Sequence, residues 1–334
     1  MRLGLDIGGT KTDAVALDDD GAIVDRVRLV TGFGAEAVIR TALDGVERVA
    51  AATGLDPRQF ASIGVGIPGQ VDAARGTVTH AVNLGFDELD VGGRLSALLG
   101  REVKVENDVK AAALGAYRLL TAGPDAASPG TAFSGEAFSG EPSAWSSARS
   151  LAYLNLGTGL AAGHVIEGAL WRGARGAAGE IGHIPFDPAG ALCPCGQRGC
   201  LETVASGSAI ARQWATDDPY PVRSLLAAAE GGHAGATRIR DRFVDGVAAA
   251  VRMLVLTLDV EIVMIGGGLS NLGPWLLDEV RRVLASWAVE SPFLASLGLD
   301  ERVLLVPAGF PAAAVGAALV GAPSAPEVER IPHG

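Results

Sequence analysis

A short apolar strand, a glycine-rich turn and a second apolar stretch occur in this order at two places in the chain. The first copy has strands over 3–7 and 13–17, and the second begins with a strand over 151–156 and continues to Val165 and Ile166. Apolar runs that alternate with Gly- and Asp-rich turns predict β-meanders at both places. The chain is therefore expected to contain two related halves, each with a glycine loop at its first corner.

Helices and further strands are expected between and after these two copies. The apolar periodicity predicts helices over 35–52, 109–120 and 311–320, and strands over 61–67, 102–105, 261–265 and 302–306. This alternation indicates an α/β fold. The chain has 334 residues, and because one domain typically has about 150, two domains with a cleft between them are expected.

The predicted domains are residues 1–120, completed by a C-terminal helix over 308–325, and residues 151–307. The segment between them, 121–150, is rich in Ala, Ser, Gly and Pro and shows no period. Such a composition is typical of a linker or a surface loop. No chemistry is therefore assigned to this segment.

Charge and hydropathy exclude two classes of partner. The chain has 38 acidic and 27 basic residues and a formal net charge of -11, which disfavours binding to a phosphate backbone. Charged residues interrupt the apolar stretches before they reach the ~20 residues that a bilayer span needs. The N-terminus also runs from Met1 into the first strand without a signal-peptide core. We therefore expect a cytoplasmic protein that binds neither nucleic acid nor membrane.

The first glycine turn has the composition of a phosphate-binding loop. Its residues are Asp6, Ile7, Gly8, Gly9, Thr10, Lys11 and Thr12. Glycines between two strands let backbone N–H groups approach phosphate, and Asp6 at a strand end can hold Mg²⁺ directly or through water. A hairpin that only needs the torsional freedom of glycine is the alternative. The loop matches neither the P-loop nor the dinucleotide-binding fingerprint.

Two later glycine runs are candidates for the rest of a nucleotide site. The residues are Gly157, Thr158 and Gly159 in the first run and Gly266, Gly267 and Gly268 in the second. The first run occupies the same position in the second copy as the phosphate loop does in the first, so the two loops could hold a triphosphate. The second run follows an apolar strand, where a backbone without side chains admits the ribose and base of adenosine. Tight packing of strand and helix is the alternative for this run.

Asp108 follows Asn107 at the end of a predicted strand and begins a helix. The helix dipole, worth ~0.3–1 kcal/mol, favours the ionised carboxylate that a general base for a hydroxyl requires. A simple helix cap is the alternative. Asp108 is therefore a candidate catalytic base only in combination with the other motifs.

The most specific motif combines one histidine with the three cysteines of the chain. The candidate ligands are His183, Cys193, Cys195 and Cys200. One imidazole and three thiolates form a closed tetrahedral set, which is typical of structural zinc. Because no position is left for water, the metal is expected to fix nearby residues in place. A redox-active or coincidental thiol cluster is the alternative.

Polar residues near these motifs suit a sugar, whose hydroxyls need many hydrogen-bond partners. The candidates are Asn83, Asn107, Asp108, Glu180, His183 and Glu202, together with Gly69, which has no side chain. Two of them, Gly69 and Asn83, lie in the segments 66–72 and 83–86, which are also consistent with turns or caps.

Taken in order, these motifs resemble the ROK family, which contains repressors, uncharacterised reading frames and sugar kinases. Glu-x-Gly-His at 180–183, followed by Cys-x-Cys-Gly-x-x-Gly-Cys-x-Glu at 193–202, is the signature of that family, and the resemblance covers residues 3–320 apart from the low-complexity segment. It implies an α/β protein with an actin-like ATPase (ribonuclease H-like) fold. It further implies two α/β domains around a cleft that holds ATP and sugar, a structural zinc site, and commonly a homodimer.

The resemblance also implies roles for the motif residues. Asp108 matches the catalytic base of the family, and residues 8–12 and 157–159 match its two phosphate motifs. The family's sugar ligands match Asn107, Glu180, His183 and Glu202, and its zinc ligands match His183, Cys193, Cys195 and Cys200. The second phosphate loop continues Leu-Ala-Ala-Gly at 160–163, where the family often has more glycine.

The implied reaction is ATP-dependent phosphorylation of a hexose or N-acetylhexosamine at the 6-hydroxyl, which gives a sugar 6-phosphate and ADP. Glucose and N-acetylglucosamine are the leading substrates. Polyphosphate as donor and a non-catalytic sugar-sensing protein are the alternatives. A DNA-binding repressor is disfavoured, because only five residues precede Asp6 where such a repressor needs a helix-turn-helix.

Overall fold

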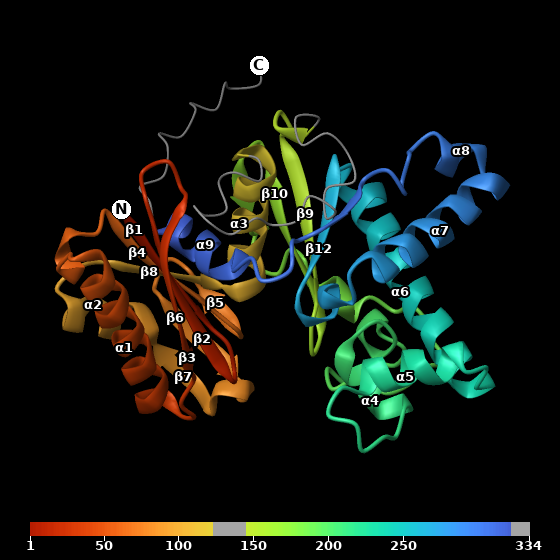
Figure 1. Cartoon of the computed structure of the whole chain (residues 1–334), viewed down its shortest axis with the longest axis horizontal. Coiled ribbons are helices and arrows are strands. Elements are labelled where there is room, and N and C mark those ends of the chain that lie inside the picture. Colours follow the sequence, from red (N-terminus) through yellow and green to blue (C-terminus); the bar gives the residue numbers. More distant parts are fainter. Residues whose placement is uncertain (123–144, 322–334) are drawn as a thin grey trace. The chain divides into compact units, whose positions relative to one another are not determined.

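The computed structural model describes residues 1–122 and 145–321, and Figure 1 labels its elements. The linker or loop expected over 121–150 therefore lies largely outside the described residues. Within these two ranges, no helix combines the length and the apolar character that a bilayer span requires.

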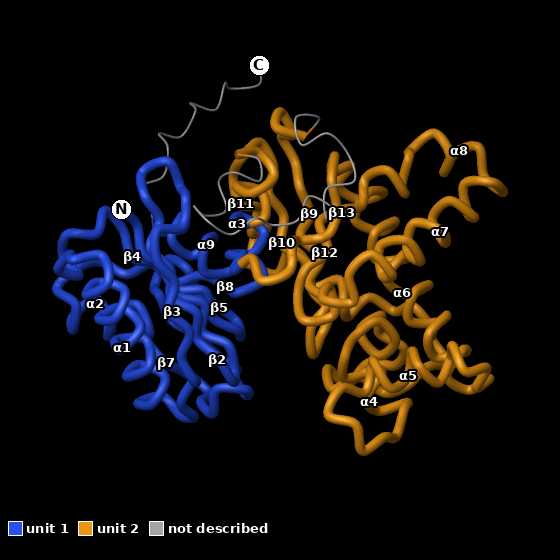
Figure 2. Tube along the Cα trace, in the orientation of Figure 1, with its two compact units in different colours: residues 1–115, 311–334 blue, residues 116–310 orange. Residues whose placement is uncertain are grey.

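The chain divides into two compact units, which Figure 2 colours separately. One unit consists of residues 1–115 and 311–334, and the other of residues 116–310. The division falls inside helix α3 (Asp108–Ala122). The domain ranges expected from the sequence stay a prediction.

The first unit is built on a mixed sheet with the strand order β3-β2-β1-β4-β8. The strands are β1 (Arg2–Ile7), β2 (Lys11–Leu17), β3 (Ile23–Val30), β4 (Ser62–Ile67) and β8 (Val103–Asn107). β1 pairs antiparallel with β2 and parallel with β4, which in turn pairs parallel with β8. The carboxyl ends of β1, β4 and β8 consequently meet at one edge of this sheet.

Helices α1 (Ala35–Thr53) and α9 (Ala312–Val320) pack against this sheet. Successive side chains of a strand point to opposite faces, and on β1 Leu5 packs toward α1 whereas Gly4 faces α9. A Cβ added at Gly4, or at Gly64 of β4, would overlap backbone atoms of α9. Glycine is therefore required for this close approach, through which the C-terminal helix completes the first unit.

A small antiparallel sheet and several short helices complete the first unit. They are β5 (Gln70–Asp72), β6 (Thr77–Ala81), β7 (Phe86–Asp90), α2 (Val91–Leu99), η1 (Pro57–Gln59) and η2 (Val82–Leu84). The residue pattern indicates only turns or caps over 66–72 and 83–86, so this sheet was not predicted. Its strands have three to five residues and bury few side chains, so they lack the apolar alternation by which strands are recognised.

The second unit repeats the topology of the first. Its sheet has the order β11-β10-β9-β12-β13. The strands are β9 (Ser150–Leu156), β10 (Leu160–Ile166), β11 (Ala169–Trp171), β12 (Ile262–Gly266) and β13 (Val303–Leu305). β9 pairs antiparallel with β10 and parallel with β12, as β1 does with β2 and β4. The two related halves that the sequence predicts are thus present as two sheets of equivalent connectivity.

Helices and short 3-10 turns complete the second unit, and Figure 1 shows α6 and α7 on the same side of β12. They are α4 (Gly207–Gln213), α5 (Pro221–Glu230), α6 (Ala234–Leu258), α7 (Pro274–Glu290), α8 (Pro292–Ala295), η6 (Ile181–His183), η7 (Leu201–Thr203) and η8 (Gly268–Leu272). The long helix α6 packs on α5, α7 and the strands β9 and β12. Buried residues such as Phe243, Leu254 and Ile265 join helices and sheet in one core.

Candidate active site and metal centre

Asp6 lies at the carboxyl end of β1 in a group of three carboxylates. Asp13 is its cross-strand partner on β2. Burial raises the pKa of Asp6 to about 8, and the charges of Asp108 and Asp13 add to this effect, whereas Arg26 and Arg28 oppose it. A buried carboxylate beside other carboxylates ionises more readily when a cation neutralises the group. This edge of the sheet therefore suits a divalent cation with oxygen ligands, such as Mg²⁺.

The first glycine loop joins β1 and β2 in a tight turn, in which the Gly8 N–H donates to the Lys11 carbonyl (2.9 Å). Thr12 is fully buried, and its hydroxyl hydrogen-bonds with the hydroxyl of Thr31 on the next segment (2.8 Å). The side chain of Lys11, in contrast, is exposed. A Cβ added at Gly9 would lie 3.2 Å from the Asn83 carbonyl oxygen. The loop thus places Gly9 beside Asn83, while the side chain of Thr12 serves packing.

Asn107 is the residue that caps α3. Its Oδ1 accepts hydrogen bonds from the N–H groups of Val109 (3.1 Å) and Lys110 (3.2 Å), and its Nδ2 donates to the Gly69 carbonyl (3.3 Å). Asp108 is the first residue of the helix, and its Oδ1 lies 2.9 Å from the Val109 N–H. The capping alternative considered for Asp108 therefore applies to Asn107, which also holds Gly69 beside the start of α3.

The second glycine loop is held by the beginning of α4. The Gly157 N–H donates to the Gly159 carbonyl (3.0 Å), which closes the turn between β9 and β10. The Gly157 carbonyl accepts from Gly207 N–H (2.9 Å), and the Thr158 carbonyl accepts from Ser208 N–H (3.2 Å). This support was not predicted, although Ser206, the residue before α4, is a recognisable helix-capping signal.

Gly266 ends β12, and it and the two glycines that follow are required for different local reasons. A Cβ at Gly266 would overlap the Tyr153 hydroxyl, and Gly267 has φ of 82° and packs against the end of β9. A Cβ at Gly268 would meet no heavy atom within 4 Å. Tight packing therefore explains the first two glycines, whereas Gly268 borders open space, as an approach by a ligand requires.

Two acidic residues of the second unit lie near the start of β10. One oxygen of Glu202 accepts from the Leu160 N–H (3.2 Å), and the other lies 3.8 Å from the sulfur of Cys193. A Cβ at Gly182 would overlap the Leu160 carbonyl, so η6 packs closely against the same strand. Glu180 directly precedes η6 and is exposed. The two 3-10 turns thus place Glu180 and Glu202 around one strand end.

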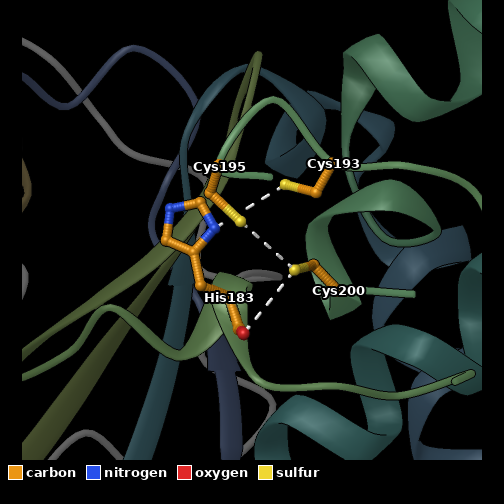
Figure 3. A group of neighbouring side chains, drawn as sticks. All are labelled: His183, Cys193, Cys195 and Cys200. Atoms are coloured by element: carbon orange, nitrogen blue, oxygen red, sulfur yellow. Dashed lines mark hydrogen bonds between the residues drawn. The ribbon is translucent and has the colours of Figure 1, made fainter. Parts of the chain in front are cut away.

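His183 and the three cysteines form a compact cluster (Figure 3). Their ligand atoms all lie within 4.8 Å of one another. The sulfurs of Cys195 and Cys200 are 3.6 Å apart, and Cys193 Sγ lies 3.8 Å from His183 Nδ1. Tetrahedral zinc with Zn–S bonds of about 2.3 Å separates its sulfur ligands by about 3.8 Å. The cluster therefore has the donors and the spacing of a structural zinc site.

Gln197 supports this cluster without belonging to it. Its Nε2 donates to the His183 carbonyl (3.3 Å) and to the Cys195 sulfur (3.5 Å), and its carbonyl accepts from the Cys193 N–H (2.8 Å). Hydrogen bonds from the backbone and then from the side chain of Gln197 lower the pKa of Cys195 to about 6. The exposed thiol of the cluster therefore reaches the thiolate form that a metal requires most easily, whereas burial raises the pKa of Cys193 and that of Cys200.

The two mixed sheets have equivalent strand orders, and each has a glycine loop at its first hairpin. Together they define an α/β fold of the actin-like ATPase class. A solved structure confirms this fold class. Streptomyces griseus glucokinase in complex with glucose and AMPPNP superposes with a TM-score of 0.72, at 28% identity, over 96% of this chain and 98% of that one.

The chain belongs to the ROK family, whose model matches residues 2–123 and 134–321. It is 30% identical over 311 residues to the glucokinase of Streptomyces coelicolor, which covers 86% of this chain and 88% of the relative. It is 29% identical over 269 residues to the N-acetylmannosamine kinase of Yersinia pseudotuberculosis, with 79% and 82% covered. Within the family, the chain is a sugar kinase that resembles glucokinase.

Proposed function

We propose that this protein transfers the γ-phosphoryl group of ATP to the 6-hydroxyl of a hexose, with Asp108 as the general base. The observation that carries the proposal is the pairing of two carboxylates at one sheet edge, where burial and then the charge of Asp108 raise the pKa of Asp6. Phosphoryl transfer needs a base that accepts the hydroxyl proton and a site for a cation bound to the phosphates. Asp108 and Asp6 are suited to these two tasks.

In the proposed step, the sugar O6 forms a bond to the γ-phosphorus while the bond from that phosphorus to the β,γ-bridging oxygen breaks. Asp108 takes the O6 proton, and ADP leaves with the electron pair of the broken bond. Backbone N–H groups of the loops 8–12 and 157–159 stabilise negative charge on the transferred group. When bound, Mg²⁺ would neutralise charge on the β- and γ-phosphates, and Asp6 would hold it directly or through water.

The proposal assigns roles in substrate binding to further residues. The proposed sugar ligands are Gly69, Asn83, Asn107, Glu180, His183 and Glu202, and the proposed adenosine contact is the run Gly266, Gly267 and Gly268. The Asn107 carboxamide positions both the start of α3 and the Gly69 carbonyl, so it supports the orientation of the neighbouring base. Because Gly268 borders open space, it is the glycine of this run that we expect to contact the nucleotide.

Glucose is the leading sugar, supported by the glucokinases of Streptomyces coelicolor and Streptomyces griseus. The N-acetylmannosamine kinase of similar identity keeps the N-acetylhexosamines, including N-acetylglucosamine, among the candidates. A change at C2 of the sugar alters one small contact, which is worth only about 1–3 kcal/mol when it is apolar. The sugar must therefore be identified by assay.

The cysteine cluster and the oligomeric state complete the proposal. The four candidate ligands would hold a zinc ion whose work is structural, since three thiolates and one imidazole leave no open position. Because Cys200 directly precedes η7, this ion would fix the turn that carries Glu202, a proposed sugar ligand. We also expect a homodimer, as is common in the family, which light scattering on the purified protein would test.

The test is an ADP-release assay with Mg-ATP against glucose, mannose, N-acetylglucosamine and N-acetylmannosamine, with Asp108→Ala as control. Turnover of one sugar that the control lacks would establish the reaction and its substrate. Long-chain polyphosphate, added in competition with ATP, would reveal the other donor by sugar 6-phosphate formed without ADP. Sugar binding without turnover of either donor would contradict the proposal and favour a non-catalytic sugar sensor.

A further inference from the structure

Asn155 occupies the position in the second sheet that Asp6 occupies in the first. The chain reads Leu-Asp-Ile-Gly at 5–8 and Leu-Asn-Leu-Gly at 154–157, and both polar residues are half-buried between fully buried neighbours. Each precedes the first glycine of its loop by two residues. Each also lies opposite a glycine on the adjacent parallel strand, Gly66 for Asp6 and Gly266 for Asn155. The equivalence therefore extends from sequence to register.

The Asn155 side chain lies between the two glycine loops of the second unit. A Cβ added at Gly157 would lie 3.4 Å from its Nδ2, and one added at Gly267 would lie 2.7 Å from its Oδ1. Across residues 1–122 and 145–321, its carboxamide makes no hydrogen bond. A polar group at a strand end, with two donors and an acceptor unused, is suited to a ligand that enters beside these loops.

The two equivalent positions differ in charge, and this difference indicates different ligands. Asp6 is a carboxylate within a group of acidic residues and suits a cation. Asn155 is neutral and offers N–H donors beside Gly157, where a carboxylate would repel an anion. An amide at this position can donate to a phosphate oxygen, and the backbone N–H groups of the same loop can do so as well.

We propose that Asn155 is a nucleotide-binding residue, whose Nδ2 donates to a phosphate oxygen of ATP next to the Gly157 loop. The proposal rests on the function proposed above and adds a residue that the motifs do not contain. Its rival is a packing role, in which Asn155 only separates the loops at Gly157 and Gly267. The two roles differ in which ligands they affect, because a packing defect would disturb adenosine and phosphate binding alike.

The experiment measures binding of three probes to the full chain by calorimetry: AMPPNP with Mg²⁺, adenosine, and glucose. Asn155→Asp keeps the size of the side chain and adds a negative charge. We expect it to weaken AMPPNP binding at least about tenfold, because a hydrogen bond to a charged group is lost and repulsion replaces it. Adenosine and glucose affinities and the melting temperature should stay within about twofold and a few degrees of the wild-type values.

Two further variants distinguish the contact from its alternatives. Asn155→Ala removes the donor without adding charge and should weaken AMPPNP binding less than Asn155→Asp does. Gln213→Glu is the matched control, since it adds a carboxylate to an exposed site on α4 of the same unit and should leave AMPPNP binding unchanged. A control that weakens binding as much as Asn155→Asp would show a general charge effect and overturn the proposal.

The outcomes separate this inference from the proposed function. Wild-type protein that binds no AMPPNP would overturn the kinase function itself. Wild-type binding with an unchanged Asn155→Asp affinity would overturn only the role of Asn155. Equal loss of adenosine and AMPPNP affinity would establish the packing role instead. Tighter AMPPNP binding by Asn155→Asp in the presence of Mg²⁺ would show that position 155 faces the cation, which also contradicts a phosphate contact.

Discussion

The Glu202 carboxylate accepts a hydrogen bond from the Leu160 backbone N–H at 3.2 Å, and its second oxygen lies 3.8 Å from the sulfur of Cys193. Leu160 directly follows the second glycine loop, and Cys193 belongs to the cluster with zinc spacing. A Cβ added at Gly159 would overlap the Glu202 carboxylate, so this contact leaves little room. The side chain of Glu202, a proposed sugar ligand, therefore lies beside both the metal cluster and a proposed phosphate loop.

Replacing the buried ligand Cys200 with serine is expected to release zinc, lower stability and weaken glucose binding together. The cluster positions Glu202, and loss of such support around a metal site typically costs about tenfold or more in activity or affinity. Elemental analysis should find about one zinc per wild-type chain and much less in the variant. Calorimetry measures the melting temperature and the glucose Kd of the same preparations.

Gln197→Ala is the matched control for this change. Gln197 donates to His183 and Cys195 but lies outside the four-ligand set. Losing these two hydrogen bonds should weaken zinc affinity about ten- to a hundredfold, which still leaves a structural zinc site occupied. The control should therefore keep its zinc and most of its glucose affinity, with a small decrease in melting temperature. Wild-type protein that is free of zinc and still binds glucose with full affinity would show that the cluster does not serve as a structural metal site.

Asp108→Asn should lower kcat about 10²- to 10⁴-fold, the typical contribution of a general base. Asn107 caps α3 through its own side chain, so the helix should keep its start in the variant. Glucose and AMPPNP should therefore bind within a few-fold of their wild-type affinities. Coupled ADP release measures turnover, and calorimetry measures the two affinities.

Asp90→Ala separates catalysis from helix capping. Asp90 caps α2 by accepting the Gly93 N–H at 2.7 Å. Loss of this cap should lower the free energy of unfolding by about 1 kcal/mol and leave kcat nearly unchanged. If Asp108→Asn instead behaves like Asp90→Ala, with lower stability and near-normal turnover, Asp108 is a structural residue and another group must accept the hydroxyl proton.

Asp6 gives the protein a pH dependence of defined sign in the absence of Mg²⁺. The folded protein keeps the Asp6 proton up to a pKa of about 8, whereas the unfolded chain releases it near pH 4. The folded state therefore binds more protons between these values, and the free energy of unfolding decreases as pH rises through this window. Asp6→Asn has no proton to release at this position, so its free energy of unfolding should not decrease in this way. The variant should be more stable than wild type at pH 9 by roughly 1–3 kcal/mol.

Urea unfolding at pH 5 and pH 9, with and without Mg²⁺, tests this expectation. Mg²⁺ should stabilise the wild-type protein at pH 9 and have a smaller effect on Asp6→Asn, whose turnover should also be low. Asp87→Asn, a change at an exposed aspartate of β7, is the control and should behave like wild type. Equal pH dependence of Asp6→Asn and wild type would mean that burial does not raise the Asp6 pKa.

The main elements of the fold could be predicted because apolar periodicity is local. The strand that carries Asp6, the strand that ends before Gly157 and the helix that begins at Asp108 follow from runs of apolar residues bounded by glycine or by polar residues. The resemblance of the two halves was visible for the same reason. The small sheet β5-β6-β7 was missed because its strands are short and mostly exposed.

Residue roles were harder to predict, because they depend on neighbours distant in sequence. That Asn107 caps α3 and also holds Gly69 requires β4 and β8 to be adjacent. That Glu202 bonds to the start of β10 requires contact between segments 42 residues apart. No local pattern encodes these contacts, whereas the spacing of the three cysteines, confined to eight residues, was sufficient to indicate a metal cluster.

Gly268→Ala separates nucleotide approach from packing in the glycine run after β12. A Cβ at this position would meet no protein atom within 4 Å, so the melting temperature should not change. If adenosine lies against Gly268, the added methyl group should raise the KM for ATP about five-fold or more, since a misfit methyl group in a filled site costs about 1–3 kcal/mol. The KM for the sugar should stay constant.

Gly267→Ala is the matched comparison and should lower stability by about 1–3 kcal/mol, because φ of 82° strains an alanine there. Steady-state kinetics with varied ATP, together with thermal unfolding of both variants, measures these effects. An unchanged KM for ATP in Gly268→Ala would place the adenosine elsewhere and leave strand-to-helix packing as the reason for the glycine run.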